Sequence, residues 1–326
     1  MEYIKQFIKN TIFWLKCARL YSVPITILSW FVIFVYSIKH NGNMFYGLIA
    51  LIGICLVHLA TNLIDDYIDY KILSKDETFI KAGRDHKCDY LRTNKATVKD
   101  LRNIIITFLT IAAIIGGILF LTSGPMVLIF ALIGLLIALA YPTFSMNGFG
   151  ELLVIIAYGP LLFEGVYYVM TKKLSIEVAI LSFACVMFVN AILYAHMLMD
   201  FDGDQKANKK TLCLMMKTKQ NALNLILLFY LISYILIVYI AYNTSNYIYL
   251  ITFITIPMVI TLYRFLKIYN EQPQKKLSNP FWNYPLDNWK QIKDTYNAPF
   301  YLRFYMARNI TTIFMLLISL AIIFEK

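Results

Sequence analysis

The sequence has little charge for its length. Only 15% of its 326 residues are charged and 60% are hydrophobic, whereas a soluble domain is roughly 25% charged and about 45–50% apolar. With a mean hydropathy of +0.63, this composition excludes an ordinary water-soluble enzyme. A disordered chain is excluded too, because disordered segments are poor in aromatic residues and 16% of this sequence is aromatic.

Cysteine is also scarce. The five cysteines, at positions 17, 55, 88, 185 and 213, are scattered, and no two of them form a C-x-x-C pair. This spacing argues against a disulfide framework or a zinc ribbon. The N-terminal region lacks a small-residue cleavage site after a short apolar core, so we expect no cleaved signal peptide.

Long apolar runs are what the sequence does have. A helix needs roughly 20 apolar residues to cross a bilayer, so we predict an all-α polytopic membrane protein with nine spans in one domain, 1–326. The spans are expected at 18–38, 44–63, 103–122, 125–141, 152–170, 176–198, 222–243, 246–266 and 307–324. Turn-forming residues at 123–125 and 243–246 separate two pairs of spans.

Two stretches outside the spans have patterns of their own. Residues 3–15 space apolar side chains among lysines, which is typical of a helix that lies in the membrane interface. Residues 268–306 carry repeated prolines, and we expect a long cytoplasmic loop there before the last span. The loop is interpreted either as a surface tether or as a cover for the site.

The positive charges that give the net charge of +11 are distributed unequally between the two sides of the membrane. With the N-terminus in the cytoplasm, every Lys and Arg falls on the cytoplasmic side except Lys39, Lys172, Lys173 and Lys326. This asymmetry follows the positive-inside rule, so we place the N-terminus and the working face on the cytoplasmic side of the cell membrane. The charge thus indicates orientation and affinity for anionic lipids or substrates, and we expect neither nucleic acid nor an obligate protein partner.

Acidic residues gather at two places on this side. At the inner end of the second span, Asn62, Asp65, Asp66 and Asp69 stand at i, i+3, i+4 and i+7, so on a continuous helix they share one face. Like charges at this spacing repel one another. Cations would remove that repulsion, and oxygen-only ligands suit a hard ion such as Mg²⁺.

The second acidic cluster ends the sixth span. His196, Asp200 and Asp204 share a face there, Asp202 points elsewhere, and lysines follow at once. Carboxylates that hold Mg²⁺, beside lysines that balance the remaining charge, suit a diphosphate. Solvated helix ends remain the alternative for either cluster alone, but two clusters on one face favour a metal–diphosphate site.

Four segments, in family order, resemble the UbiA superfamily of membrane prenyltransferases. They read A-R-L-Y-S-V-P at 18–24, N-L-I-D-D-Y-I-D at 62–69, G-F-G-E with Y-G-P-L and G-V-Y-Y within 148–168, and D-F-D-G-D with K-K-T-L within 200–212. The third segment is similar to the 1,4-dihydroxy-2-naphthoate polyprenyltransferases of menaquinone synthesis.

The resemblance implies about nine helices around a central cavity and Mg²⁺-dependent transfer of a polyprenyl group from an allylic diphosphate to an aromatic acceptor. It implies metal ligands at Asn62, Asp66, Asp69, Asp200 and Asp204, the four aspartates being the catalytic set. It implies diphosphate contacts for Arg19, Lys209 and Tyr141. It implies acceptor contacts for Glu151 and His196.

The sequence departs from the family pattern near the acceptor. Asp65 stands where the family has Asn, and the family's N-N-x-R-D appears as His196 to Asp200. Transfer to hydroxybenzoate, a lipid or haem therefore stays open, as does an ion-coupled transporter, although transporters hold ions near the midplane. The single-segment signature of a CDP-alcohol phosphotransferase is absent. Glu164 lies deep in a span without an assigned role, and His58 is expected to be a core residue.

Overall fold

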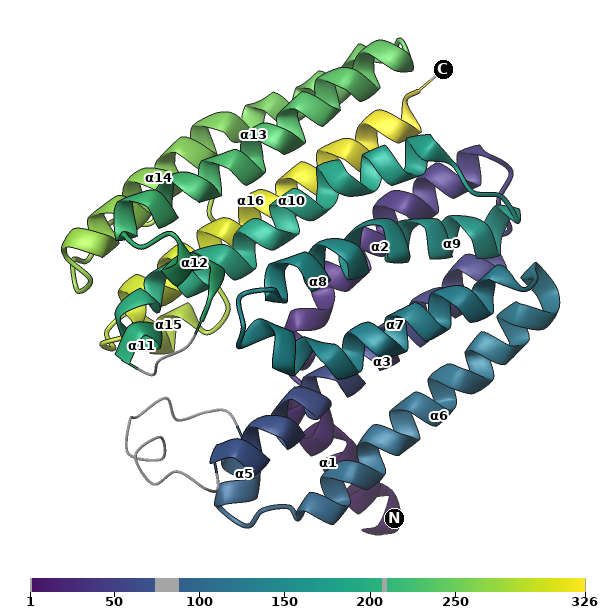
Figure 1. The fold of residues 1–326 in the computed structure, drawn as a ribbon, viewed down its shortest axis with the longest axis horizontal. Coiled ribbons are helices and arrows are strands. Elements are labelled where there is room, and N and C mark those ends of the chain that lie inside the picture. The colour runs from purple at the N-terminus through teal and green to yellow at the C-terminus, as the bar shows by residue number, and fades with distance from the viewer. Residues whose placement is uncertain (1, 74–87, 207–209, 326) are drawn as a thin grey trace.

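The computed structural model describes residues 2–73, 88–206 and 210–325, and helices without any strand form the regular structure of these ranges (Figure 1). Within them, 9 helical segments are long and apolar enough to cross a membrane. They are Leu20–Lys39, Met44–Lys71, Val98–Ser123, Met126–Ser145, Gly150–Thr171, Ile176–Met199, Lys219–Asn243, Tyr247–Glu271 and Ala298–Ile323. The predicted all-α polytopic fold is confirmed.

Most of these spans are single α-helices. They are α2 (Val23–Lys39), α3 (Met44–Leu73), α6 (Val98–Ser123), α7 (Met126–Ser145), α10 (Ile176–Met199), α13 (Lys219–Asn243) and α16 (Ala298–Ile323). The first span has the 3₁₀ turn η1 (Leu20–Ser22) ahead of α2, and two further spans change helix type along their length. The fifth runs through α8 (Gly150–Ile156), η2 (Ala157–Leu161) and α9 (Leu162–Thr171), and the eighth through η3 (Tyr247–Thr255) and α14 (Ile256–Glu271).

Burial separates central helices from outer ones. Over an 18-residue apolar stretch of α10 and of α16, 67% and 61% of the residues are buried, whereas the figures for such a stretch of α6 and of α7 are 11% and 17%. A membrane helix with most of its surface exposed faces lipid, because lipid tails are as apolar as its side chains. The helices α10 and α16 therefore lie in the packed centre, and α6 and α7 form an outer wall.

Short helices collect at one end of the bundle. These are α5 (Asp89–Arg92), α11 (Phe201–Lys206), α12 (Leu212–Met215) and α15 (Trp289–Ile292). They lie at the end where α3 and α10 finish, and the N-terminal helix α1 (Glu2–Cys17) reaches the same end (Figure 1). The two acidic clusters, which sit at the ends of α3 and α10, are thus brought to one end of the molecule.

A sharp break separates α1 from the first span. Arg19 adopts a left-handed backbone with φ 59°, and a short 3₁₀ turn, Leu20–Ser22, follows before α2 begins. A positive φ is uncommon for a side chain of this size and is often found where a site constrains the backbone. The first span thus begins a few residues later than position 18, and Arg19 stands at the corner.

The fifth span is broken at its centre. Gly159 has φ −94° and ψ −114°, which no helix contains, and Pro160 follows it in the π-helical turn η2. Proline lacks the N–H that would continue the α-helical ladder, so the helix opens there. The predicted span 152–170 is present, but it consists of two helices joined by an irregular turn.

The final span starts earlier than predicted. Helix α16 begins at Ala298, with Pro299 in its first turn, where proline is favoured. The prolines of 268–306 had indicated a loop throughout, but α14 continues to Glu271 at one side and α16 takes the other. The non-helical part is correspondingly shorter and contains the single turn α15.

Candidate functional site

One cavity of about 2210 Å³ joins the two acidic clusters. Asn62, Asp65, Asp66 and Asp69 line it from α3, while Asp200 and Asp204 line it from the end of α10 and from α11. Residues far apart in the sequence thus face one space. Because α3 is continuous through Leu73, its four polar side chains do lie along one helix.

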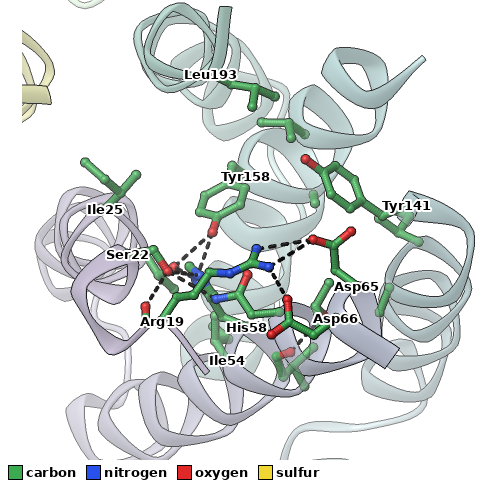
Figure 2. A pocket seen from close by; sticks show the side chains of 18 of the residues that line it. Arg19, Ser22, Ile25, Ile54, His58, Asp65, Asp66, Tyr141, Tyr158 and Leu193 are labelled. Atoms are coloured by element: carbon green, nitrogen blue, oxygen red, sulfur yellow. Dashed lines mark hydrogen bonds and ion pairs between the residues drawn. The ribbon is translucent and has the colours of Figure 1, made fainter. Parts of the chain in front are cut away.

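Arg19 pairs with two carboxylates of the first cluster. Its Nη1 and Nη2 each lie 3.2 Å from Oδ2 of Asp65, and Nη2 also bonds Oδ1 of Asp66 (Figure 2). Burial opposes the charge of Arg19 most strongly, but attraction to Asp66 and Asp65 outweighs it, so the pKa of Arg19 lies above its ordinary value. The guanidinium is therefore a fixed positive charge beside two carboxylates.

Asp66 has a second partner from outside the spans. The Tyr90 hydroxyl donates to Oδ2 of Asp66 at 3.0 Å, and the Cys88 thiol donates to the Asp66 carbonyl oxygen at 3.2 Å. Burial, followed by the nearby negative charge of Asp66, raises the pKa of Tyr90, so this phenol stays a donor. Asp66 is consequently oriented by groups from the α1–α2 corner and α5 as well as by its own helix.

The second cluster sits at a helix break. Helix α10 ends at Met199, Asp200 follows as its cap, and the Asp204 N–H donates to the Asp200 carbonyl at 2.9 Å. Nδ1 of His196 lies 3.5 Å from Oδ2 of Asp200, and its ring packs edge-on against Phe300 at 5.1 Å. Asp202 instead pairs with Lys219 at 2.6 Å, outside the residues that line the cavity.

Beyond the acidic end the cavity is apolar and runs between the outer helices. Among the larger apolar side chains that line it there, α3, α6 and α7 contribute many small ones, namely Ala50, Gly53, Ala112, Ala113, Gly116, Ala131, Gly134 and Ala138. Small residues on three facing helices leave space that larger side chains would fill. The site thus combines a polar, charged end with a long apolar interior.

The other predicted site residues differ in whether they line the cavity. Tyr141 lines the cavity. Glu151 does not line it; this side chain is buried, and its Oε1 has no hydrogen-bond partner within the described part of the chain. Lys209 lies outside the described residues. Glu164, which had no assigned role, accepts a hydrogen bond from the Ser175 N–H at 3.3 Å beyond the cavity lining.

The cavity-lining groups that were not foreseen from the sequence include Ser22, Thr26, Tyr90 and Tyr158. The i, i+4 spacing of Ser22 and Thr26 on an apolar helix is a signal that could have indicated a polar face. Tyr90 carries no comparable signal, because it belongs to a short helix after a polar segment. His58, expected in the core, is only partly buried and also lines the cavity.

The donor set of the acidic end is composed of carboxylate and amide oxygens, which suits a hard divalent cation. Over the described ranges, no three acidic, His or Cys side chains are gathered closely enough to hold a metal by themselves. Mg²⁺ needs no such cage, since it binds through one or two carboxylates and completes its shell with water and phosphate oxygens. The residues present therefore fit a cation that arrives with a phosphorylated ligand.

An apolar cavity within a bundle of membrane spans, with two acidic clusters at one end, is the architecture of a membrane-embedded prenyltransferase. The chain belongs to the UbiA prenyltransferase family, whose model matches residues 23–284. It is thereby a membrane-bound enzyme of the prenyltransferase class.

Solved structures show the same fold at low sequence identity. A structure reported for digeranylgeranylglyceryl phosphate synthase is 15% identical, with a TM-score of 0.61 over 99% of both chains. A UbiA homologue from Aeropyrum pernix K1 is 14% identical, with a TM-score of 0.63 over 92% of this chain and 98% of that one.

A UbiA homologue from Archaeoglobus fulgidus, in complex with GPP and Mg²⁺, is 14% identical, with a TM-score of 0.58 over 95% of this chain and 99% of that one. Among curated proteins, no sequence matches this chain.

Proposed function

We propose that this protein transfers a polyprenyl group from an allylic diphosphate to 1,4-dihydroxy-2-naphthoate, with Mg²⁺ as its cofactor, in menaquinone synthesis. The cavity carries the proposal, because one continuous space joins two oxygen-rich clusters to an apolar interior. A polyprenyl diphosphate has the same two parts. The homologue in complex with GPP and Mg²⁺ supports the assignment of the charged end to the diphosphate.

The carboxylates act in this proposal as metal ligands. Asn62, Asp66 and Asp69 would hold one Mg²⁺, and Asp200 and Asp204 would hold the other, with water and phosphate oxygens completing each shell. Bound Mg²⁺ stabilises negative charge on the departing diphosphate oxygens. Arg19, whose guanidinium lies beside Asp65 and Asp66, would contact the phosphates, as would Lys209 and Tyr141.

The apolar interior protects the reactive carbon. When the allylic C–O bond breaks, the electron pair leaves with the diphosphate, and the carbon must meet the acceptor before it meets water. Apolar side chains of α3, α6 and α7 exclude water along the isoprenoid tail. The ring carbon of the acceptor supplies the electron pair of the new bond, and the ring regains its aromaticity by releasing either a proton to the departing diphosphate or the carboxylate as CO2.

The acceptor assignment rests on the Gly-Glu and Gly-Pro-Leu resemblance and on the aromatic surroundings of His196. Phe300 and Phe304 meet the His196 ring at 5.1 and 6.3 Å, and all three side chains line the cavity. An aromatic acceptor would pack against such rings in offset or edge-on geometry. Glu151 does not line the cavity, so its assignment to the acceptor rests on the Gly-Glu resemblance alone.

Orientation and organisation form part of the same proposal. The distribution of Lys and Arg places the N-terminus and the acidic end on the cytoplasmic side of the cell membrane. Anionic lipid headgroups are the expected neighbours of this end. The whole chain, 1–326, is treated as one domain without an obligate protein partner.

The experiment is formation of prenylated naphthoate by membranes that contain the protein, followed by mass spectrometry. Asp66→Asn and Asp200→Asn are each expected to lower product formation by about 100-fold or more, because a metal contributes several kcal/mol. Asp202→Asn is the matched control, since Asp202 neighbours Asp200 but pairs with Lys219. Equal losses in all three variants, or product that needs no Mg²⁺, would contradict the proposal.

A further inference from the structure

A cluster of hydroxyl groups around one histidine lies in the cavity, deeper than the carboxylates. Nδ1 of His58 lies 2.5 Å from the Thr26 hydroxyl and 2.9 Å from the Tyr158 hydroxyl, and these two hydroxyls are 3.2 Å apart. Nε2 of His58 lies 2.8 Å from the Ser22 hydroxyl. Figure 2 shows Ser22, His58 and Tyr158 beside Arg19, and all four cluster members line the cavity.

The hydrogen bonds assign the tautomer of His58. The single hydroxyl proton of Ser22 is donated to the Arg19 carbonyl oxygen at 2.8 Å. The Ser22 oxygen therefore accepts from Nε2–H of His58, which leaves Nδ1 with a lone pair and no proton. Nδ1 is thus an acceptor aimed at two hydroxyl groups.

One lone pair cannot bind two hydroxyl protons well. Thr26 and Tyr158 compete for Nδ1, so one of them donates to Nδ1 and the other has its proton available for its neighbour or for a ligand. Both oxygens also keep lone pairs that can accept. The cluster therefore offers a cavity-facing position at which an outside hydroxyl group can donate and accept together.

The cluster is placed at the right depth for the second substrate. His58 stands one helical turn before Asn62 on α3, so it lies about 6 Å deeper along the helix. Ser22 links the two levels, because it also accepts from the Asn62 amide at 3.2 Å. An acceptor carbon must approach the allylic carbon to roughly 3–3.5 Å, and a ring hydroxyl held one turn beyond the diphosphate keeps its neighbouring carbon within that reach.

Tyr158 reaches the cluster from an irregular part of the fold. It lies in the π-helical turn η2, between α8 and the broken backbone at Gly159. Such turns inside helices are frequent at functional sites. A second tyrosine–threonine pair lies away from the cavity. The hydroxyl oxygens of Tyr234 and Thr255 are 2.7 Å apart, and neither residue lines the cavity.

We infer that Thr26, His58 and Tyr158 form the subsite that binds a hydroxyl group of the prenyl acceptor and so orients its nucleophilic carbon. The inference rests on the proposed function and names positioning residues, which touch the acceptor but not the diphosphate. A hydroxyaromatic ring and the free hydroxyl of a glycerol lipid share this chemistry, so the subsite requires a hydroxyl-bearing acceptor.

The test compares Tyr158→Phe with wild type in steady-state kinetics. Loss of one neutral hydrogen bond is expected to raise the KM for the dihydroxynaphthoate acceptor roughly 3- to 10-fold and to leave the KM for the prenyl diphosphate unchanged. Tyr234→Phe is the matched control, with both constants unchanged, because it removes a tyrosine–threonine hydrogen bond away from the cavity. Thr26→Val tests the same subsite from α2 and is expected to act in the same direction.

A substrate series separates positioning from damage to the fold. The two monohydroxy-2-naphthoates, with the hydroxyl at ring position 1 or 4, are measured as competitive inhibitors of wild type and Tyr158→Phe. The analogue that lacks the recognised hydroxyl is expected to bind wild type roughly 3- to 10-fold more weakly than the dihydroxy compound. In Tyr158→Phe the difference in affinity between this analogue and the dihydroxy compound is expected to shrink, since part of the interaction with the recognised hydroxyl is already lost.

A parallel assay with a glycerol-lipid acceptor identifies the source of the hydroxyl, because only the acceptor whose KM responds to Tyr158→Phe occupies the subsite. Unchanged acceptor constants in both assays would overturn the inference while leaving prenyl transfer intact. If wild type forms no product, the proposed function fails, and binding decides the inference. Weaker calorimetric binding of the dihydroxynaphthoate to Tyr158→Phe supports it, and equal binding overturns it.

Discussion

Arg19 shapes the acidic end both through its backbone conformation and through the ion pairs of its side chain. Its left-handed backbone turns the chain from α1 into the first span, and its side chain joins Asp65 and Asp66 of α3. The sequence placed Arg19 near the diphosphate through a motif but gave no reason to pair it with Asp65. That pairing depends on the corner at residue 19, which local sequence does not specify.

Replacement of Arg19 by Gln is expected to weaken prenyl diphosphate binding. The variant keeps hydrogen-bonding capacity but removes the positive charge, and charge-assisted hydrogen bonds are about twice as strong as neutral ones. We expect the KM for the prenyl diphosphate to rise about 10-fold or more, with the acceptor KM nearly unchanged. Initial rates with each substrate varied in turn provide the measurement; an unchanged diphosphate KM would exclude Arg19 from the phosphate contacts.

Cys17 reports on the electrostatics of the same corner. Burial, and next the negative charge of Asp66, raises the pKa of Cys17 from an ordinary 9.0 to about 11. The folded protein favours the protonated thiol of Cys17 more than the unfolded chain does. The stability that follows is fully present below pH 9 and is lost as the pH rises through the folded-state pKa. At neutral pH the reactive thiolate is correspondingly rare.

The pKa of Cys17 is measured by the reaction of iodoacetamide with a variant that retains only this cysteine. We expect its rate to rise steadily from pH 7 to beyond pH 10, whereas an ordinary thiol levels off above about pH 9. In the Asp66→Asn background the midpoint should fall, because one of the two causes is removed. A midpoint near 9 in the starting protein would show that Cys17 is not held in a buried, negatively charged setting.

At the level of helices, the sequence predicted the spans well and their ends less well. Long apolar runs determine where helices cross, but capping determines where they begin. Helix α6 starts at Val98 because the Thr97 hydroxyl accepts from the Asp100 N–H at 3.2 Å while Asp100 accepts from the Thr97 N–H at 3.0 Å. Such pairs extend a helix beyond its apolar run.

The break in the fifth span shows a second limit of sequence reasoning. Gly159 and Pro160 indicate an interruption, yet the direction in which Tyr158 then points depends on packing against α10. His58 was expected in the core because it stands in an apolar span, and its sequence neighbours do not show what it faces. Its partners Thr26 and Tyr158 come from two other spans, and no local pattern reveals that they meet.

The small residues of α7 leave cavity space that a larger side chain introduced by mutation can fill. A Cβ at Gly134 would meet only Leu161 Cδ2, at 3.7 Å, so a side chain fits there without a clash at its base. Gly134→Phe is expected to fill the apolar cavity and to lower kcat/KM for long polyprenyl diphosphates about 10-fold or more relative to a short one. Gly134→Ala, which adds one methyl group, is the control.

Competition between a short and a long allylic diphosphate in one reaction measures this ratio directly. An unchanged ratio in Gly134→Phe would show that the tail does not pass α7. Equal loss for both lengths would point to damage of the fold.

For the whole molecule, the bundle places both acidic clusters at one end, and apolar side chains line the cavity beyond them. Both acidic clusters, Arg19 and the hydroxyl cluster line the same cavity, although they come from several spans. The sequence predicted both acidic clusters at one end of the bundle, which Figure 1 shows for the ends of α3 and α10, whereas the fold was needed to show that the clusters line one cavity.

The orientation of this end in the membrane can be tested by labelling from outside the cell. The exposed residues Lys173 and Lys217 lie on loops at opposite ends of the bundle. We expect Lys173→Cys to react with a membrane-impermeant maleimide on intact cells, and Lys217→Cys to react only after the cells are opened, because basic loops stay in the cytoplasm. The reverse pattern would place the acidic end outside.

The central claim is that the acidic clusters of α3 and α10 bind one substrate together. Binding of a non-reactive polyprenyl thiodiphosphate, titrated with Mg²⁺ by calorimetry, tests it most directly. We predict that Asp66→Asn and Asp200→Asn each weaken Mg²⁺-dependent binding about 10-fold or more, while Asp202→Asn leaves it unchanged. Binding that depends on one cluster alone, or that ignores Mg²⁺, would contradict the account.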